Sequence, residues 1–248
     1  MIRKTAIIIG GSSEIGKATA YNLAQSGYNL ALTYNSNNLE DDKEFLEKLK
    51  SFGCEAKCYN LNLLEPNSVE TFFEQIKKDF KCVDALVYVS GIAQKRQLIF
   101  DISNEEIDAL FEVNVKSAIK CTREFVKLTI NKNPASIVYV GSFVEKSGCS
   151  CESIYTATKS ALSGLCKSLA TELGNLDIRC NVVAPGFIDT KMNDNLSKAD
   201  KLDIAEMTPL KRLGEVKDVA NAIEFLVGEK ASFITGQTVF VDGGLMLE

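Results

Sequence analysis

Short apolar runs alternate with segments of helical periodicity from one end of the chain to the other. The runs predict strands at residues 5–9, 28–34, 54–61, 83–90, 136–141, 178–184 and 237–241. The intervening segments predict helices near 15–26, 39–51, 66–79, 104–131, 153–174 and 215–228. Apolar and β-branched residues fill consecutive positions of the runs, as expected when both faces of a parallel sheet are covered. Right-handed crossovers then give a Rossmann-type, doubly wound α/β sheet of about seven strands.

The length and composition of the chain fit one α/β domain. It has 248 residues, of which 46% are hydrophobic, enough to build a sizeable core. No linker, repeat or low-complexity segment interrupts the alternation, so we expect a single domain over residues 1–248. The stretch 189–212 differs, because it is polar and its Met and Leu residues are irregularly spaced. Long segments of this kind are often lids or binding loops, so we expect a substrate lid there.

The charge balance argues against several kinds of partner. A net charge of −5 disfavours general affinity for nucleic acid or anionic membranes. No apolar run approaches the ~20 residues that a membrane span requires. The apolar stretch after Lys4 is also too short for the core of a signal peptide. We therefore expect a cytoplasmic protein with no nucleic-acid or membrane partner.

The eight cysteines invite a metal or disulfide interpretation, but the chain has no His and no C-x-x-C motif. Cys54 and Cys58 share a predicted strand, where four residues at about 3.3 Å each separate them by roughly 13 Å, too far to bind one ion. Cys149 and Cys151 form a close pair in a predicted loop. We expect reduced thiols that act as small apolar side chains, and no metal site. The lack of His also excludes Ser-His and Cys-His nucleophiles.

The sequence GGSSEIG, residues 10–16, follows the first predicted strand and precedes a helix. Glycines such as Gly10 and Gly16 let the backbone approach a pyrophosphate, and a helix N-terminus supplies N–H donors and a positive dipole end. Ser12 and Ser13 can donate hydroxyl groups to a phosphate, although a Gly-Ser turn can also be plain N-capping. The position of the turn, after the first strand of an α/β chain, favours a dinucleotide site.

The end of the second predicted strand bears on the choice of dinucleotide. Residues 33–38 read TYNSNN and contain no Asp or Glu, which NAD sites usually use to bind the ribose 2′-hydroxyl. No Arg or Lys stands there to meet a 2′-phosphate either, but Asn35 and Ser36 can donate hydrogen bonds to one. We therefore expect NADP(H), with NAD(H) possible, and a preference for NADPH of about tenfold.

The strongest signal is GSFVEKSGCSCESIYTATKSAL, residues 141–162. Tyr155 and Lys159 are four residues apart on a predicted helix and share one face. A Tyr phenol has a pKa of about 10, and a neighbouring ammonium in a partly dry pocket is expected to lower it. Ser142 ends the fifth predicted strand and can hydrogen-bond a carbonyl oxygen beside the Tyr hydroxyl. A Y-x-x-x-K pattern occurs by chance on many helices, but Ser142 and the glycine turn favour a catalytic interpretation.

The chain resembles the classical short-chain dehydrogenases/reductases over about residues 4–244. The resemblance rests on the glycine turn, Asn114 in FEVNVKSA, Ser142, Tyr155 with Lys159, and the stretches APGFIDTKM and ASFITGQTVFVDGG. These two stretches, with TPLKRLGE, are most similar to the 3-oxoacyl-[acyl-carrier-protein] reductase branch. GCSCESIYTATKSAL and APGFIDTKMNDNLS are also similar to elongation factor P 5-aminopentanone reductases.

The resemblance implies a role for each predicted catalytic residue. Tyr155 would protonate a carbonyl oxygen while hydride arrives from a nicotinamide, and Ser142 would polarise the carbonyl. Lys159 would bind the nicotinamide ribose and lower the pKa of Tyr155, and Asn114 would hold a water that relays protons to Lys159. The full set expected to bind the cofactor is Gly10, Ser12, Ser13, Ile15, Gly16, Asn35, Ser36, Asn62, Leu63, Ser90, Gly91, Tyr155, Lys159, Pro185, Gly186, Ile188 and Thr190. The resemblance also implies a homotetramer, assembled through the helices near 104–131 and 153–174 and the last strand.

The departures from the family pattern cluster on the cofactor side. Ile9 and Glu14 replace the Thr and the middle glycine of T-G-x-x-x-G-x-G, Ser13 replaces an Arg common in NADPH-using reductases, and residues 88–91 read YVSG instead of N-N-A-G. A carboxylate at a helix N-terminus is favoured by the dipole and can accept an unpaired N–H. If the Glu14 carboxylate pointed into the site, it would repel a pyrophosphate and weaken dinucleotide binding by about 1–3 kcal/mol. We expect Glu14 to point outward as a capping residue.

These features support one leading hypothesis and three alternatives. The leading hypothesis is a ketoreductase acting on a small-molecule or carrier-protein-borne carbonyl. The alternatives are a 5-aminopentanone reductase acting on elongation factor P, a reductase of a free small ketone, and a non-catalytic nucleotide-binding scaffold. An acyl carrier protein is acidic, so the candidate docking cations are Lys191, Lys198, Lys201, Lys211 and Arg212.

Overall fold

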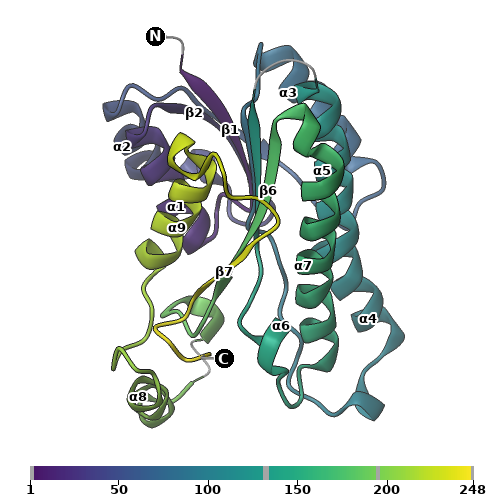
Figure 1. Cartoon of the computed structure of the whole chain (residues 1–248), viewed down its shortest axis with the longest axis vertical. Helices are drawn as coiled ribbons and strands as arrows, with labels where there is room; N and C mark the ends of the chain where they lie inside the picture. Colours follow the sequence, from purple (N-terminus) through teal and green to yellow (C-terminus); the bar gives the residue numbers. More distant parts are fainter. Residues whose placement is uncertain (1–2, 131–133, 194–195, 247–248) are drawn as a thin grey trace.

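The structure is a computed structural model that describes residues 3–130, 134–193 and 196–246 (Figure 1). At its centre is a seven-stranded parallel sheet with the strand order β3-β2-β1-β4-β5-β6-β7. The strands are β1 Lys4–Ile9, β2 Tyr28–Tyr34, β3 Ala56–Asn60, β4 Ala85–Tyr88, β5 Ala135–Val140, β6 Ile178–Pro185 and β7 Thr238–Val241. The strand order reverses between β1 and β4, which is the switch point where such sheets bind ligands. The predicted doubly wound sheet is confirmed.

Helices cover both faces of the sheet. They are α1 Glu14–Gln25, α2 Lys43–Ser51, α3 Ser68–Asp79, α4 Asn104–Phe111, α5 Ser117–Thr129, α6 Val144–Ser147, α7 Ser153–Leu173, α8 Lys198–Met207 and α9 Val216–Val227. The α1, α2 and α9 helices lie on one face, and α3, α5 and α7 lie on the other (Figure 1). The described part of the chain contains no helix long and apolar enough to cross a membrane.

The β1 strand shows how the sequence builds two cores. Ile7 and Ile9 pack toward α3, α5 and α7, whereas Ala6 and Ile8 pack toward α1, α2 and α9. All four side chains are fully buried. Because successive side chains of a strand point to opposite faces, a run of consecutive apolar residues satisfies a sheet that is covered on both sides.

The predicted helix 104–131 contains an interruption. A π-helical segment, Glu112–Lys116, joins α4 to α5 and carries Asn114. A π-helical turn has an i→i+5 hydrogen-bond pattern and often marks a functional site. The regular helical periodicity of the sequence does not reveal it, because the apolar stripe continues on both sides. Residue 131, at the end of the predicted helix, lies outside the described residues.

Most other predicted elements differ from the structure by one or two residues at their ends, and three differ for a clear reason. The predicted strands 54–61 and 83–90 are shorter, as β3 and β4, because strand pairing covers only their central residues. The predicted helix 39–51 begins with a separate 3-10 turn, Leu39–Asp41. The side chain of Asp42 then caps α2 by accepting the N–H of Phe45 at 3.1 Å, so α2 begins after it.

The polar stretch 189–212 contains two short helices. A 3-10 turn spans Lys191–Asn193, and α8 follows after residues 194–195, which lie outside the described residues. A capping box between Ser197 and Asp200 starts α8. None of the residues of α8 is buried. The function of this stretch as a substrate lid remains a prediction.

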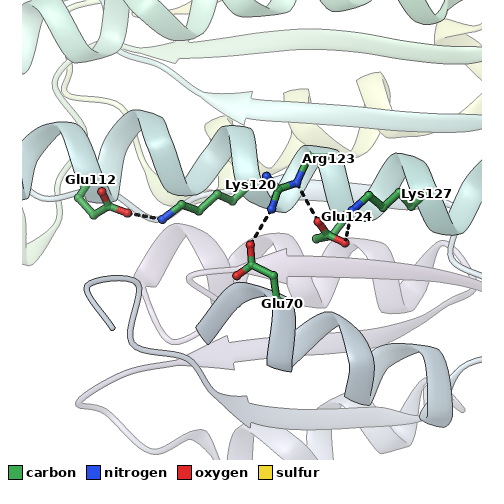
Figure 2. A network of polar contacts seen from close by, with 6 residues as sticks. All are labelled: Glu70, Glu112, Lys120, Arg123, Glu124 and Lys127. Carbon is green, nitrogen blue, oxygen red and sulfur yellow. Dashed lines mark hydrogen bonds and ion pairs between the residues drawn. The ribbon is translucent and has the colours of Figure 1, made fainter. Parts of the chain in front are cut away.

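Ion pairs run along the exposed side of α5 (Figure 2). Lys120 Nζ lies 2.5 Å from a carboxylate oxygen of Glu112, at the start of the π-helical segment. Arg123 lies 2.6 Å from Glu70 on α3 and 2.8 Å from Glu124. Exposed pairs contribute only about 0–1 kcal/mol each. They connect α5 to α3 and to the π-helical segment.

The cysteines supply small apolar side chains to the core. All eight carry free thiols, and Cys54, Cys121, Cys166 and Cys180 are buried. Burial raises the pKa of Cys54 and of Cys58 to about 11, so both thiols stay protonated near neutral pH. A protonated thiol is a poor nucleophile and a poor metal ligand.

Candidate active site

A pocket of about 410 Å³ opens at the carboxyl ends of the central strands. The segments that follow β4, β5 and β6 line it, together with the first turns of α1 and α7. Several residues predicted from the sequence meet here: Ile15, Gly91, Ser142, Tyr155, Lys159, Pro185, Gly186, Ile188 and Thr190. The pocket therefore occupies the switch point of the sheet, where an α/β fold of this topology binds its ligands.

Tyr155 lies in the first turn of α7, and its backbone is held by Gln94. The Gln94 Oε1 atom accepts the N–H of Ile154 at 2.9 Å and the N–H of Tyr155 at 3.1 Å. Its Nε2 atom donates to the carbonyl of Cys151 at 3.1 Å. The residue preceding α7, Glu152, makes no side-chain cap, so Gln94 satisfies the unpaired N–H groups of this helix end. The buried Gln94 thus orients the turn that carries Tyr155.

The pKa of Tyr155 is raised to about 12, chiefly because the phenol is buried, although a hydrogen bond from Ser142 partly opposes this. The sequence led us to expect a pKa lowered by Lys159, and that expectation is wrong for this structure. Lys159 Nζ lies 5.6 Å from the centroid of the Tyr155 ring and donates to the carbonyl of Val140 at 2.9 Å. The ammonium is therefore directed at the backbone. Near neutral pH the phenol is fully protonated, as a proton donor must be.

Lys159 is fully buried, and burial lowers its pKa to about 8. The charge of Glu145 opposes this shift by stabilising the ammonium. Glu145 Oε1 accepts the hydroxyl of Ser163 at 2.6 Å, and Oε2 is buried with no hydrogen-bond partner among the described residues. Burial raises the pKa of Glu145 in turn. Lys159 in the pocket lining and the half-buried Glu145 are thus two electrostatically coupled ionisable groups, and the sequence analysis did not find Glu145.

Asn114 is fully buried in the π-helical segment. Its Oδ1 accepts the N–H of Ile92 at 2.8 Å, and its Nδ2 donates to the carbonyl of Ile92 at 3.0 Å and to Thr158 Oγ1 at 3.1 Å. A Cβ atom at Gly91 would lie 3.2 Å from Lys159 Nζ and 3.4 Å from Asn114 Oδ1. Asn114 and Lys159 are therefore neighbours across Gly91, as the sequence hypothesis requires.

The glycine turn fits a phosphate group. Gly10 has a φ of +90°, which favours glycine, and a Cβ atom at Gly16 would lie 2.2 Å from the carbonyl oxygen of Gly10. Ser13 caps α1 by accepting the N–H of Gly16 at 3.0 Å. The N–H groups of Glu14 and Ile15 precede the first hydrogen bonds within the helix and can bind an anion. This cradle fits the pyrophosphate of a dinucleotide.

Four other predicted cofactor residues, Asn35, Ser36, Asn62 and Leu63, are not part of the pocket lining, and neither is Ser90, although its neighbours Val89 and Gly91 are. Asn35 and Ser36 are exposed at the end of β2. The Asn62 side chain accepts the N–H of Leu64 at 3.1 Å and donates to Glu65 at 3.0 Å, so it stabilises its own turn. Leu63 is buried, and its carbonyl accepts the hydroxyl of Ser117 at 3.3 Å. Ser90 lies against the glycine turn, with its N atom 2.8 Å from the position of a Cβ at Gly10.

The sequence of the whole chain matches known proteins. A family model described as enoyl-(acyl carrier protein) reductase matches residues 10–246. The uncharacterized oxidoreductase YmfI of Bacillus subtilis is 37% identical over 244 residues, 98% of this chain and 99% of that protein. The 3-oxoacyl-[acyl-carrier-protein] reductase FabG of Staphylococcus epidermidis is 33% identical over 246 residues, 99% of this chain and 100% of that protein.

The chain is also similar in fold to a solved structure that contains NADP. That structure is a short-chain dehydrogenase from Burkholderia cenocepacia J2315 in complex with NADP, with a TM-score of 0.89 and 29% identity, covering 98% of this chain and 97% of that chain. This chain belongs to the short-chain dehydrogenase/reductase family. It is an oxidoreductase of the kind that acts on CH–OH groups.

In this short-chain dehydrogenase/reductase, Glu14 replaces the middle glycine of the family pattern. We expected Glu14 to cap α1, but the structure gives it another partner. Ser13, and not Glu14, caps α1. The Glu14 carboxylate leaves its own helix, and its Oε2 accepts the backbone N–H of Lys191 at 2.9 Å. The interaction joins residues 177 positions apart, so no local pattern predicts it.

The lining of the pocket also includes apolar and charged side chains. The rings of Phe143 and Phe187 lie 5.0 Å apart between centroids, and Cys149 also lines the pocket. Arg96 Nε lies 3.2 Å from a carboxylate oxygen of Glu152, and both residues line the pocket. The sequence analysis assigned none of these residues to the site, although all but Arg96 lie within the stretches GSFVEKSGCSCESIYTATKSAL and APGFIDTKM.

The cations predicted to face an acidic carrier protein are partly neutralised in this short-chain dehydrogenase/reductase. Three of them pair with nearby carboxylates: Lys201 with Asp189, Lys211 with Glu206, and Arg212 with Asp218. The net positive field around the 189–212 stretch is therefore weaker than its count of basic residues indicates.

Proposed function

We propose that the protein is an NADPH-dependent carbonyl reductase that converts a 3-oxoacyl thioester into the 3-hydroxyacyl thioester. The observation that carries the proposal is the convergence of Ser142, Tyr155 and Lys159 on one pocket beside a phosphate cradle. The nicotinamide would supply the hydride to the carbonyl carbon. The identity of about 33% to FabG supports the choice of a 3-oxoacyl substrate.

Four residues of the chain have different roles in the proposed proton transfer. The protonated Tyr155 phenol donates its proton to the carbonyl oxygen, where the negative charge develops, and the Ser142 hydroxyl hydrogen-bonds the same oxygen. Lys159, whose pKa is about 8, is charged near neutral pH and lines the same pocket, where its ammonium can bind the nicotinamide ribose, as the family resemblance implies. Both N–H groups of the Asn114 amide are used by Ile92 and Thr158, so Asn114 acts by holding the π-helical backbone beside Lys159.

We infer that NADP(H) is the preferred cofactor, although NAD(H) can fit the same cradle. The short-chain dehydrogenase of Burkholderia cenocepacia was solved with NADP, and residues 33–38 of this chain contain no carboxylate to repel a 2′-phosphate. The exposed Asn35 and Ser36 can donate hydrogen bonds to that phosphate.

The first test measures turnover and cofactor preference together. We expect the protein to oxidise NADPH in the presence of a short 3-oxoacyl thioester, and to bind NADPH about tenfold more tightly than NADH. Absorbance at 340 nm gives the rate, and fluorescence titration gives both dissociation constants. Tighter binding of NADH would reverse the cofactor assignment. Cofactor binding with no turnover of any ketone would indicate a nucleotide-binding scaffold.

The second test asks whether a protein carries the substrate. The remaining basic side chains of the 189–212 stretch can attract an acidic acyl carrier protein, and such attraction is screened by salt. We expect kcat/KM for the carrier-bound substrate to fall about two- to fivefold between 50 and 300 mM salt, while that of a free thioester analogue stays constant. Equal salt dependence for both substrates would contradict a carrier-borne acceptor.

A second candidate function is the reduction of an aminoalkyl ketone, as in the 5-aminopentanone modification of elongation factor P. The observation that favours it is the carboxylate of Glu152, which lines the pocket and can pair with a substrate ammonium in place of Arg96. A ketone with a terminal amine serves as the comparison substrate in the salt experiment. A kcat/KM for this ketone above that of the thioester would favour the second candidate.

A further inference from the structure

Glu14 connects the two sides of the pocket. It is the first residue of α1, next to the pocket-lining Ile15, and its carboxylate accepts the N–H of Lys191 at 2.9 Å. Lys191 begins the 3-10 turn Lys191–Asn193 and directly follows Thr190, which also lines the pocket. The carboxylate therefore bridges the glycine turn and the segment after β6.

The segment after β6 is held to its own side of the pocket by separate contacts. Asp189 donates its N–H to the carbonyl of Gly214 at 2.9 Å. Asn193 donates its side-chain N–H to the carbonyl of Ile188 at 2.8 Å and its backbone N–H to the carbonyl of Thr190 at 2.9 Å. These bonds shape the turn, whereas the bond from Lys191 to Glu14 sets its distance from α1.

The hydrogen bond from Lys191 also fixes the position of the negative charge of the Glu14 carboxylate. The carboxylate is exposed, and one of its oxygens accepts the backbone N–H of Lys191 in the segment after β6. A hydrogen bond from an N–H to an ionised carboxylate is stronger than a neutral one, and the N-terminal dipole of α1 stabilises the same charge. Glycine at this position, as in the family pattern, has no group that can make this bond.

We propose that Glu14 is a positioning residue that holds Thr190 and Lys191 at a fixed distance from the glycine turn. Thr190 is one of the residues expected to contact the nicotinamide end of the cofactor, so the proposal rests on the proposed function for its effect on NADPH. With the tether in place, the binding wall formed by Thr190 is already ordered before the cofactor enters. Preorganisation of this kind strengthens binding without adding a contact to the ligand.

The experiment compares Glu14→Ala and Glu14→Gln with the wild-type chain. The Gln side chain has a similar length and keeps a carbonyl oxygen that can accept from Lys191, whereas Ala has no acceptor. Glu44→Ala, which removes a carboxylate from the first turn of α2, serves as the matched control for the loss of one negative charge. Ser13 still caps α1 in all three variants.

The first readout is hydrogen exchange in the free protein, resolved to the Lys191 amide. We expect exchange at this amide to be about two- to tenfold faster in Glu14→Ala, and close to wild type in Glu14→Gln and Glu44→Ala. Unchanged exchange in Glu14→Ala would overturn the tether. This readout needs no cofactor, so it stands apart from any failure of the proposed function.

The second readout is the dissociation constant of NADPH, with kcat measured alongside. We expect Glu14→Ala to weaken NADPH binding about two- to tenfold with little change in kcat, and Glu14→Gln to restore most of the affinity. A charge that merely repels the pyrophosphate would instead give tighter binding in both variants, and that result would overturn the positioning role. If the chain binds no NADPH, the proposed function fails while faster exchange in Glu14→Ala still supports the tether.

Discussion

Tyr155→Phe is expected to lower the rate of NADPH-dependent carbonyl reduction by about 10³- to 10⁴-fold while the melting temperature hardly changes. The substitution removes one hydroxyl group, which is the proposed proton donor, and keeps the aromatic ring that Lys159 contacts. The turn around residue 155 is held through its backbone by Gln94, so the ring remains in place. Steady-state NADPH oxidation and thermal unfolding by circular dichroism measure the two quantities.

Tyr139→Phe is the matched control for this experiment. Its hydroxyl lies 2.6 Å from that of Thr122 in the buried core of the same sheet. Its loss is expected to lower the free energy of unfolding by about 1 kcal/mol and to leave turnover near wild type. If Tyr155→Phe retained a third of the wild-type rate, Tyr155 would not be the proton donor.

Lys159→Met is expected to abolish turnover to a similar extent and, at the same time, to stabilise the protein. The fully buried ammonium has a pKa of about 8 in place of 10.5, which shows that the fold disfavours its charged form. Methionine removes this cost and loses the bond to the carbonyl of Val140. We expect a net gain of about 1–2 kcal/mol at pH 7, or about 2–8 °C in Tm.

The pH dependence of the stability difference between Lys159→Met and the wild type tests this prediction independently. Below about pH 8, Lys159 is charged in both the folded and the unfolded chain, so the full cost of burying the charge is present. Between about pH 8 and 10.5 the folded chain releases the proton and the unfolded chain keeps it, so wild-type stability rises relative to the Met variant. The difference in Tm should therefore be largest at pH 7 and shrink toward pH 10.

Lys167→Met makes the same chemical change at an exposed position of α7 and should alter the melting temperature little at either pH. A lower Tm for Lys159→Met at pH 7 would show that the contacts of the ammonium outweigh the cost of its burial. In that case Lys159 would be a structural residue as well as a functional one.

The sequence by itself determined the fold class and the predicted catalytic set. Alternating apolar runs and helical periodicity are local patterns, because they follow from how side chains point along a strand or a helix. Tyr155 and Lys159 were found in the same way, since residues four apart on a helix share a face. The glycine turn was also readable, because its spacing reflects backbone conformation over a few residues.

Only the tertiary structure decided how the site is held and charged. Gln94 orients Tyr155 across about sixty residues of sequence, and Glu14 reaches Lys191 across 177. The pKa of Tyr155 was predicted to fall and instead rises, because the phenol is buried and the Lys159 ammonium is directed at the backbone carbonyl of Val140. Burial and long-range contacts depend on which segments the fold brings together, and no local pattern of residue types contains that information.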